Sequence, residues 1–345
     1  MGRVSLRREY LIERLGLKEV KVLVTGATGF IGRHLVERLI HEGHHVRALV
    51  LPEENMPAVE SVSMDIVRGD VCDYQTVERA AMNCQLIFHL AAKTEASGAS
   101  RNAFEVVNVQ GTANVARAAR HAGAGRLVFC SSGALYGRAI RNRSIKEETI
   151  PVPDSAYGRS KFLAEQILLS HYQCDGLPVV MARISAVLGP GAMSWLNLFK
   201  TIAAGQFRLI GDGRNFHHVA DIADIVDGLA LCGSVTGIEG KTYILAGAKP
   251  VQLRDLVQII AEAVGAPGLP TNLPVLPFRL YKMASRHLFS WTGYRLPRAD
   301  RIDLYLGDRA FDLSLSDREL SYVPKVSTKE AVQRTAAWFK EYSYI

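Results

Sequence analysis

The chain has 345 residues, 48% of them hydrophobic and 22% charged, so it can bury a large core and does not have the composition of a disordered protein. Lysine and arginine exceed aspartate and glutamate by seven, which permits an anionic ligand, a nucleic acid or an anionic membrane as partner but selects none of them. The five cysteines are odd in number and widely spaced, which argues against a disulfide framework and a structural zinc site.

Residues 1–19 are charged and predict a short helix ahead of the fold. They contain no apolar run of the kind found in signal peptides, and no later segment approaches about 18 uninterrupted apolar residues. We therefore expect a cytoplasmic protein with no transmembrane segment. Peripheral contact with a membrane surface stays open.

The fold begins at Val20 with a short apolar, β-branched run, VKVLVTG, followed by a helical pattern over residues 29–43. The same alternation of strand and helix continues to about residue 183, which predicts a doubly wound α/β protein with a parallel sheet of the Rossmann type. The further strands are expected at His45–Val50, Asp65–Gly69, Gln85–Leu90, Arg126–Ser131 and Pro178–Arg183, and the helices at Asp73–Met82, Ala103–His121 and Ala156–His171.

After residue 184 the regular alternation of strand and helix gives way to shorter elements separated by glycine and proline. We expect residues 20–183 to form a dinucleotide-binding domain and residues 184–345 to form mainly a substrate-binding lobe, with some later segments returning to the first domain. Residues 278–298 are both aromatic and basic. They predict a helix that covers the lobe; an apolar cover over the substrate and a membrane-surface contact are the alternatives.

The stretch TGATGFIG places Gly26, Gly29 and Gly32 three apart between the first strand and the first helix. A side chain at such a turn would block the approach of a pyrophosphate, while the helix N-terminus offers free N–H groups and the positive end of its dipole. This context favours a dinucleotide-binding loop over a purely structural turn. The residues expected to contact the cofactor in this loop are Gly26, Thr28, Gly29, Phe30, Ile31 and Arg33.

The sequence leaves the choice between NAD and NADP open. An acidic residue at the end of the second strand favours the free ribose 2′-hydroxyl, and an arginine favours the 2′-phosphate. Leu51 occupies that tip with Glu53 just beyond it, so Glu53 supports NAD whereas Arg33 supports NADP. After the third strand, Asp70 and Val71 are placed to hydrogen-bond and cover an adenine edge, with a simple turn as the alternative.

Tyr157 and Lys161 lie four residues apart at the start of a predicted helix, and hence on one face of it. A phenol with a pKa near ~10 is a poor base at neutral pH, but a neighbouring ammonium and a positively charged nicotinamide favour the phenolate. The pair then predicts a general base for an alcohol or an acid for a carbonyl. Ser131 and Ser132 end the fifth strand, where Ser132 is expected to hold the substrate oxygen.

Together these motifs resemble the extended short-chain dehydrogenase/reductases, a family that includes the NAD-dependent epimerase/dehydratases. The resemblance covers essentially the whole chain beyond residue 20. The matching stretches are TGATGFIG (25–32), GDVCD (69–73), FHLAA (88–92), NVQGT (108–112), CSSGALYG (130–137), YGRSK (157–161), RISAVLGPG (183–191) and HHVADIAD (217–224).

The resemblance implies an enzyme that uses NAD or NADP, with Ser132, Tyr157 and Lys161 as its catalytic residues and no metal. It also implies that His89 lines or supports the dinucleotide site and that the protein is a homodimer packed through the two long helices of the first domain. Beyond the glycine loop, the cofactor residues expected are Asp70, Val71, Leu90, Ala91, Ala92, Asn108, Tyr157 and Lys161.

Departures from the family pattern bear on the small-molecule substrate. Many members that use nucleotide sugars carry Arg-Pro-x-Asn after the sixth strand, whereas this chain has Arg183-Ile-Ser-Ala186. Arg214, in contrast, matches the arginine that many such enzymes direct at the nucleotide diphosphate. The tail resembles the 3β-hydroxysteroid dehydrogenase-like branch, at Phe311, Asp312, Ser314, Leu320, Tyr322 and Pro324.

Three functions remain to be separated. The favoured one is an NAD(P)-dependent oxidoreductase that transfers hydride at a secondary alcohol or ketone of a bulky, mostly apolar substrate. The alternative is a sugar-nucleotide epimerase or dehydratase, and the third is a dinucleotide-sensing protein without activity. Nucleic-acid binding is not expected because the basic residues are dispersed and no aromatic-interleaved patch is present.

Overall fold

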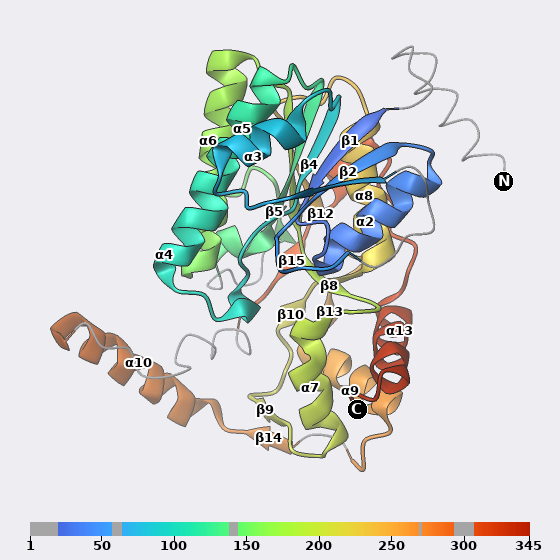
Figure 1. Cartoon of the computed structure of the whole chain (residues 1–345). Coiled ribbons are helices and arrows are strands. Elements are labelled where there is room, and N and C mark those ends of the chain that lie inside the picture. The colour runs from blue at the N-terminus through green and yellow to red at the C-terminus, as the bar shows by residue number, and fades with distance from the viewer. Residues whose placement is uncertain (1–19, 57–63, 138–143, 269–270, 293–306) are drawn as a thin grey trace.

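The computed structural model describes residues 20–56, 64–137, 144–268, 271–292 and 307–345 (Figure 1). The helix predicted within residues 1–19 therefore lies outside the described residues. Across the described ranges, no helix combines the length and apolarity needed to cross a membrane.

The centre of the molecule is a seven-stranded parallel sheet in the order β12-β7-β5-β4-β1-β2-β3. The prediction of a doubly wound α/β fold is confirmed. The order reverses between β1 and β4, and in open sheets of this kind ligands bind outside the carboxyl ends of the strands at such a switch point. The strands are β1 (Lys21–Thr25), β2 (His45–Val50), β3 (Met64–Arg68), β4 (Leu86–His89), β5 (Arg126–Ser132), β7 (Val179–Ile184) and β12 (Thr242–Leu245).

Helices cover both faces of this sheet (Figure 1). One face carries α2 (Phe30–His41) and α8 (Ile222–Ser234), and the other carries α3 (Tyr74–Ala81), α5 (Gly111–His121) and α6 (Ala156–Asp175). The side chains of β1 show why helices are needed on both faces of the sheet. Val22 and Val24 enter the core beneath α2, while Leu23 enters the core on the opposite face, because successive strand residues point to opposite sides.

The helix predicted over Ala103–His121 is longer and less regular than the periodicity indicates. It begins with α4 (Arg101–Phe104), passes through a π-helical segment (Glu105–Gln110) and continues as α5. Such bulges are frequent at functional sites. Here the bulge carries Asn108, whose contacts are described below.

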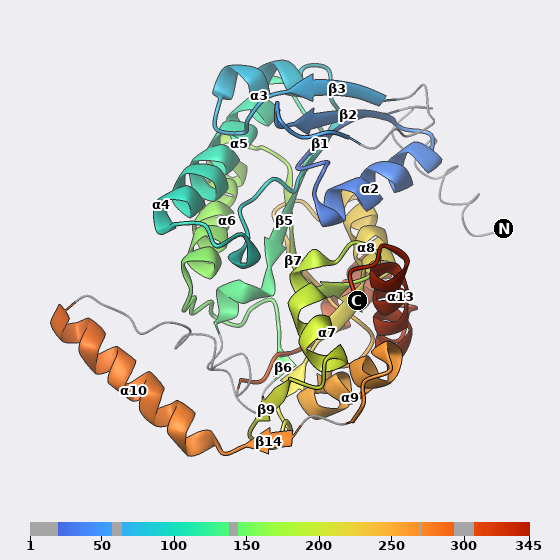
Figure 2. The same cartoon turned by 60° about the horizontal axis from the view of Figure 1, so that its bottom comes forward.

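The lobe has its own core, built mainly from α7 (Leu196–Ala203), α9 (Leu253–Val264) and α13 (Thr328–Glu341). It lies beyond the carboxyl ends of the sheet strands (Figure 2). α10 (Val275–Thr292) extends from it, and α12 (Ser314–Leu320) packs against β12. Short strands pair β8 (Ala186–Leu188) with β11 (Val219–Asp221), β9 (Arg208–Ile210) with β14 (Thr271–Leu273), β10 (Phe216–His217) with β13 (Val251–Gln252) and β6 (Ser144–Ile145) with β15 (Ala310–Phe311).

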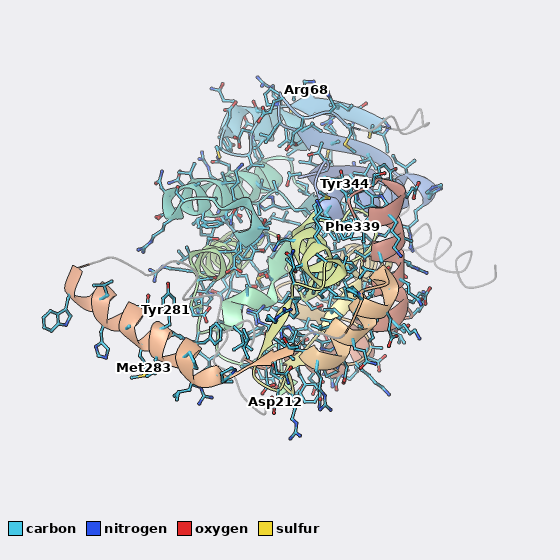
Figure 3. The ribbon with its side chains drawn as sticks, turned by 90° about the horizontal axis from the view of Figure 1, so that it is seen from below. Arg68, Asp212, Tyr281, Met283, Phe339 and Tyr344 are labelled. Carbon is cyan, nitrogen blue, oxygen red and sulfur yellow. The ribbon has the colours of Figure 1, made fainter. Side chains whose placement is uncertain are left out.

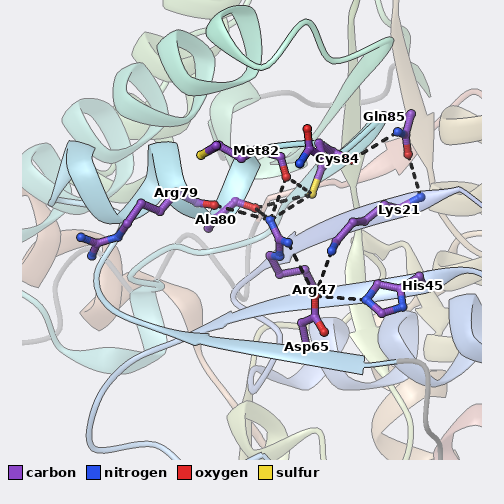
Figure 4. A network of polar contacts seen from close by, with 10 residues as sticks. Lys21, His45, Arg47, Asp65, Arg79, Ala80, Met82, Cys84 and Gln85 are labelled. Atoms are coloured by element: carbon purple, nitrogen blue, oxygen red, sulfur yellow. Dashed lines mark hydrogen bonds and ion pairs between the residues drawn. The ribbon is translucent and has the colours of Figure 1, made fainter.

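The amino ends of the first strands are held by a polar cluster at the edge opposite the lobe (Figure 4). Asp65 on β3 lies 3.0 Å from Lys21 Nζ on β1 and 3.1 Å from His45 Nε2 on β2. The hydrogen bonds of His45 and Lys21 lower the pKa of Asp65 to about 2. Arg47 donates to the carbonyl oxygens of Ala80 and Met82, which holds the end of α3 beside the same strands.

Candidate active site

A cavity of about 1890 Å³ opens between the carboxyl ends of the sheet strands and the lobe. It is lined on the sheet side by the glycine-rich turn, by the end of β4 and by β5 with the start of α6. A cavity for a single small ligand usually measures roughly 300–1,000 Å³, so this one has room for a dinucleotide together with a substrate. The predicted residues that line it are Gly26, Thr28, Gly29, Phe30, Ile31, Arg33, Leu90, Ala92, Ser132 and Tyr157.

The glycine-rich turn has the geometry that a pyrophosphate requires. Gly26 has φ +70°, and a Cβ there would lie 2.6 Å from the backbone nitrogen of Ala91, so no other residue fits without displacing β4. Gly29 precedes α2, whose first turn contains no acidic side chain and receives no side-chain cap. The first N–H groups of α2 therefore face the cavity without a built-in anion, which fits the phosphates of a dinucleotide.

The loop after β2 places a carboxylate against the glycine-rich turn. Thr28 Oγ1 donates a hydrogen bond to Glu54 Oε2, and Arg68 holds the loop by donating to the carbonyl oxygens of Pro52 and Glu54. Glu53, which the sequence suggested for this role, is exposed. The acidic residue that reaches the turn is thus one position further along the chain.

Arg33, the residue that suggested NADP, is engaged with a different part of the molecule. Its Nη2 donates to the carbonyl oxygen of Pro190 at 2.7 Å, and its guanidinium lies 6.0 Å from the Trp338 ring. It thereby joins the start of α2 to the lobe. Arg33 lines the cavity, but its guanidinium is directed toward Pro190 and not toward the loop after β2.

The first turn of α6 is held close to the end of β5. Ser155 caps α6 by accepting from the Gly158 backbone N–H at 3.0 Å. A Cβ on Gly158 would lie 2.6 Å from the Ala134 carbonyl oxygen, so the glycine of the YGRSK motif permits this approach. Tyr157 and Ser132 consequently both line the cavity, where the Ser132 hydroxyl acts to lower the pKa of the Tyr157 phenol.

Lys161 lies one turn further along α6 and is 3% exposed. Its Nζ donates to the Cys130 carbonyl oxygen at 2.8 Å and stands 4.6 Å from the centre of the Phe129 ring. Burial lowers the pKa of the Lys161 ammonium. Burial also raises the pKa of the Tyr157 phenol above its usual value, while the hydrogen bond with Ser132 acts in the opposite direction.

Asn108 is buried behind the cavity and connects three elements. Its Oδ1 accepts from the Lys93 backbone N–H at 2.8 Å, and its Nδ2 donates to the Lys93 carbonyl and to Ser160 Oγ. Ser160 in turn donates to the carbonyl oxygen of Tyr157. The π-helical segment therefore fixes the chain after β4 relative to the start of α6. Asn108 does not line the cavity.

His89, at the end of β4, is fully buried in a chain of hydrogen bonds. Thr112 Oγ1 gives its proton to the Asn108 carbonyl, so it accepts from His89 Nε2 at 2.9 Å, and His89 Nδ1 accepts from Thr25 Oγ1 at 2.7 Å. Burial lowers the pKa of His89 to about 3, and the charge of Lys161 acts in the same direction. His89 is neutral and braces β1, β4 and α5.

A buried ion pair fixes the far side of α6. Glu165, one turn beyond Lys161, accepts from Arg183 Nη2 at 2.7 Å and from Arg183 Nε, and it also accepts from Ser131 Oγ. Arg183 Nη1 donates to the Tyr136 hydroxyl at 2.6 Å. Glu165 was not predicted from the sequence, although its four-residue spacing from Lys161 places it on the same face of the helix.

Besides Asn108 and Lys161, four further predicted residues do not line the cavity. Asp70 accepts from the Cys72 backbone N–H and forms a turn, and Val71 is buried beside Gly111. Ala91 donates its N–H to Thr25 Oγ1 and lies against Gly26. Arg214 is exposed, with its Nε 3.5 Å from Asp212. Their roles as cofactor or substrate contacts remain predictions.

The sequence did not predict which residues of the lobe line the cavity. The 3₁₀ turn Met193–Trp195 and α7 supply much of it, and the Trp195 indole donates to the Val187 carbonyl at 2.9 Å, which holds the ring in place. His218 stands at the junction of lobe and sheet, where its Nε2 lies 2.6 Å from the Gly247 carbonyl oxygen. No cluster of potential metal ligands is found among the described residues. The apolar residues of this wall are Val187, Met193, Trp195, Leu198, Phe207, Leu253 and Leu256.

Comparison with known proteins identifies the group to which this arrangement belongs. Residues 22–244 match the NAD dependent epimerase/dehydratase family, which covers the sheet, the glycine-rich turn and α6. The chain belongs to that family. The resemblance to the extended short-chain dehydrogenase/reductases is thereby confirmed, and the protein is an NAD(P)-dependent enzyme of this type.

Several proteins similar to this chain are named as reductases or dehydrogenases. The chain is 29% identical over 333 residues to the 2-alkyl-3-oxoalkanoate reductase of Stenotrophomonas maltophilia, covering 92% of this chain and 99% of the relative. It is 26% identical over 338 residues to a 3 beta-hydroxysteroid dehydrogenase/Delta 5-->4-isomerase of Mycobacterium tuberculosis, covering 92% and 90%. Among solved structures, gox2253 superimposes with a TM-score of 0.82 at 27% identity, covering 94% of this chain and 99% of that chain.

Proposed function

We propose that this enzyme interconverts a ketone and a secondary alcohol on a bulky, mostly apolar substrate, with NAD as its preferred coenzyme. The observation that carries the proposal is the single cavity in which the glycine-rich turn, Ser132 and Tyr157 meet. A hydride transfer needs its coenzyme, its substrate oxygen and its proton donor in one water-poor space. This cavity supplies a position for each.

The proposed roles follow from the contacts of each side chain. Bound NAD(P) supplies or accepts the hydride at the substrate carbon. Tyr157 donates its phenolic proton to the carbonyl oxygen during reduction and takes it back during oxidation, while the Ser132 hydroxyl holds that oxygen. We assign Lys161, which lies one turn along the same helix face and donates to the Cys130 carbonyl oxygen, the role of stabilising the phenolate that reduction leaves behind.

The protonation state of Tyr157 favours the reductive direction at neutral pH. Because burial raises the pKa of this phenol, the proton is present and can be donated to a carbonyl. Oxidation requires the phenolate, so its rate should rise with pH while the rate of reduction falls at high pH. The names of the relatives, among them a 2-alkyl-3-oxoalkanoate reductase, agree with reduction of a ketone that carries apolar chains.

The preference for NAD is supported by Glu54. Its carboxylate lies on the loop after β2, where the ribose of a dinucleotide is expected, and contacts Thr28 of the glycine-rich turn. A carboxylate there accepts from a 2′-hydroxyl but repels a 2′-phosphate. In the Glu54→Gln variant the kcat/KM ratio of NAD to NADP should fall by about tenfold, since one repulsive charge is removed. Glu53→Gln, on the exposed neighbour, should leave the ratio unchanged. Equal ratios in wild type and Glu54→Gln would contradict the preference.

The substrate class is supported by the lobe wall, which presents aliphatic and aromatic side chains to the cavity. Arg214, the residue that suggested a nucleotide diphosphate, is exposed and does not line this wall. The asparagine that many nucleotide-sugar enzymes carry is replaced by Ala186. These features favour an apolar ketone over a nucleotide sugar.

The function is tested by supplying purified enzyme with reduced coenzyme and two panels of compounds. One panel contains ketones with long alkyl or fused-ring substituents, and the other contains nucleotide sugars. We expect net oxidation of the coenzyme with the ketones and none with the sugars. Epimerised or dehydrated sugar without net coenzyme turnover would overturn the proposal in favour of an epimerase or dehydratase.

We further propose a homodimer packed through α5 and α6 and a reducing, cytoplasmic location. The location is supported by free cysteines at positions 72, 84, 130, 174 and 232. The dimer rests on the family resemblance. Light scattering of the full chain tests it, and a monomer at micromolar concentration would contradict it.

A further inference from the structure

α10 stands apart from the rest of the molecule. It follows β14, which pairs with β9 at the rim of the lobe, and extends away from the body of the protein (Figures 1 and 2). Among the described helices, none packs along its length. The apolar side chains of this 18-residue helix that stay exposed need another surface to bury them.

Four exposed apolar side chains of α10 lie on one face, which also carries His287, while Tyr281 and Leu288 lie outside it. Leu276, Leu280, Met283 and Trp291 recur at helical spacing and are 66%, 55%, 55% and 88% exposed. Ser285, on the opposite side of the helix, is only 4% exposed. Figure 3 shows Tyr281 directed toward the body and Met283 directed away from it. The apolar face therefore points outward and cannot cover this chain's own cavity.

The charge of this segment is also unusual. Residues 275–292, which form α10, contain three lysines or arginines and no aspartate or glutamate, so the helix carries a net charge of +3. Arg279 and Lys282 lie three residues apart, which puts them beside one edge of the apolar face. An outward apolar face bordered by cations matches an anionic bilayer surface, where apolar side chains enter the acyl boundary and cations meet lipid phosphates.

We propose that α10 docks the enzyme onto an anionic phospholipid surface. The helix lies in the plane of the interface and does not span it, in keeping with the finding that no described helix can cross a membrane. A second copy of this chain is a poorer occupant, because packing the same face against itself in a symmetric dimer would bring two helices of charge +3 together. The proposal is independent of the reaction at the cavity.

Vesicle flotation of the full chain tests the proposal, with vesicles of phosphatidylcholine alone and of phosphatidylcholine mixed with phosphatidylglycerol. We expect the wild type to float with the anionic vesicles at least tenfold more than with the zwitterionic ones, since each cation near the surface strengthens binding roughly fivefold. The difference should shrink between about 0.1 M and 0.5 M salt, because salt screens the attraction. Equal binding to both vesicles, or no binding to either, overturns it.

Two variants locate the contact. Leu280→Asp/Trp291→Asp removes the apolar face, and Arg279→Glu/Lys282→Glu reverses two charges; each should lose roughly tenfold or more of the bound fraction. The matched controls are Ile150→Asp, an apolar side chain 79% exposed elsewhere, and Arg318→Glu/Lys329→Glu, which reverses two exposed charges outside α10. Both controls should float like wild type.

Folding of every variant is checked by circular dichroism and by coenzyme binding, neither of which should change. Flotation of the α10 variants at the wild-type level overturns the proposal. The proposal is also overturned if the wild type is a dimer that binds no vesicles and Leu280→Asp/Trp291→Asp converts that dimer to a monomer. That result would assign the face to a second copy of the chain.

Discussion

The two walls of the cavity are built in different ways. The sheet wall carries Tyr157, Lys161 and Ser132 on elements joined by buried polar contacts, among them the pair of Glu165 and Arg183. The lobe wall is made of short strands and the helices around α7, and it meets the cavity largely through apolar side chains. Hydrogen bonds and buried charges fix atoms in one arrangement, whereas apolar contacts accept many shapes. The sheet wall therefore suits a fixed chemistry, and the lobe wall suits a variable substrate.

Among substitutions in the sheet wall, removal of the proposed proton donor should lower activity the most. Tyr157→Phe should lower kcat by about 10²–10⁴-fold, the usual contribution of general acid catalysis, and should leave coenzyme affinity unchanged. Steady-state kinetics with a ketone substrate and coenzyme titration measure the two quantities. Tyr172→Phe, further along the same helix, is the control and should turn over like wild type. Full activity in Tyr157→Phe would remove the assignment.

Breaking the buried ion pair should destabilise the same wall. Glu165→Gln leaves the Arg183 guanidinium buried without its counter-charge, which should cost about 3–5 kcal/mol of unfolding free energy. Urea denaturation measures the loss. Glu330→Gln, in an exposed pair with Arg334, should cost less than about 1 kcal/mol. Similar losses in both variants would show that the buried pair holds α6 no more firmly than a surface contact holds α13.

The junction of the two walls should respond to pH through His218. Burial lowers the pKa of His218 to about 4 from its ordinary 6.5, so its contribution is complete above pH 6.5. As the pH falls from 6.5 to about 4 the unfolded chain takes up a proton that the folded one refuses, and on the order of 3 kcal/mol of stability is lost. His218→Gln should flatten this part of the stability profile, measured by denaturation between these pH values. A profile parallel to wild type would contradict it.

Substitutions on the lobe wall should act more weakly and on substrate binding. Met193→Ser removes an apolar side chain from the cavity and should raise KM for an apolar ketone about fivefold, with kcat little changed. Arg214→Ala, which lies outside the cavity, should leave both constants unchanged. A large rise in KM for Arg214→Ala would restore the case for an anionic, nucleotide-linked substrate.

Sequence patterns predicted the sheet side well because its constraints are local. The strand and helix alternation, the glycine spacing and the four-residue step from Tyr157 to Lys161 are each visible within a few residues of chain. The predicted helix over Ala103–His121 missed a π-helical segment, since the periodicity is nearly the same with or without the extra residue. Glu54 was missed because the loop after β2, and not the strand tip, brings the carboxylate back to Thr28.

The amino-acid sequence by itself determined the fold class, the glycine-rich turn and the three residues proposed for chemistry. These depend on backbone conformation and helical spacing, which short stretches of chain encode. Only the tertiary structure decided that Arg33 binds Pro190, that Arg214 lies outside the cavity and that the apolar face of α10 points away from the protein. Those outcomes depend on which distant segments come together, and a side chain's neighbours across the fold are set by the packing of the whole chain.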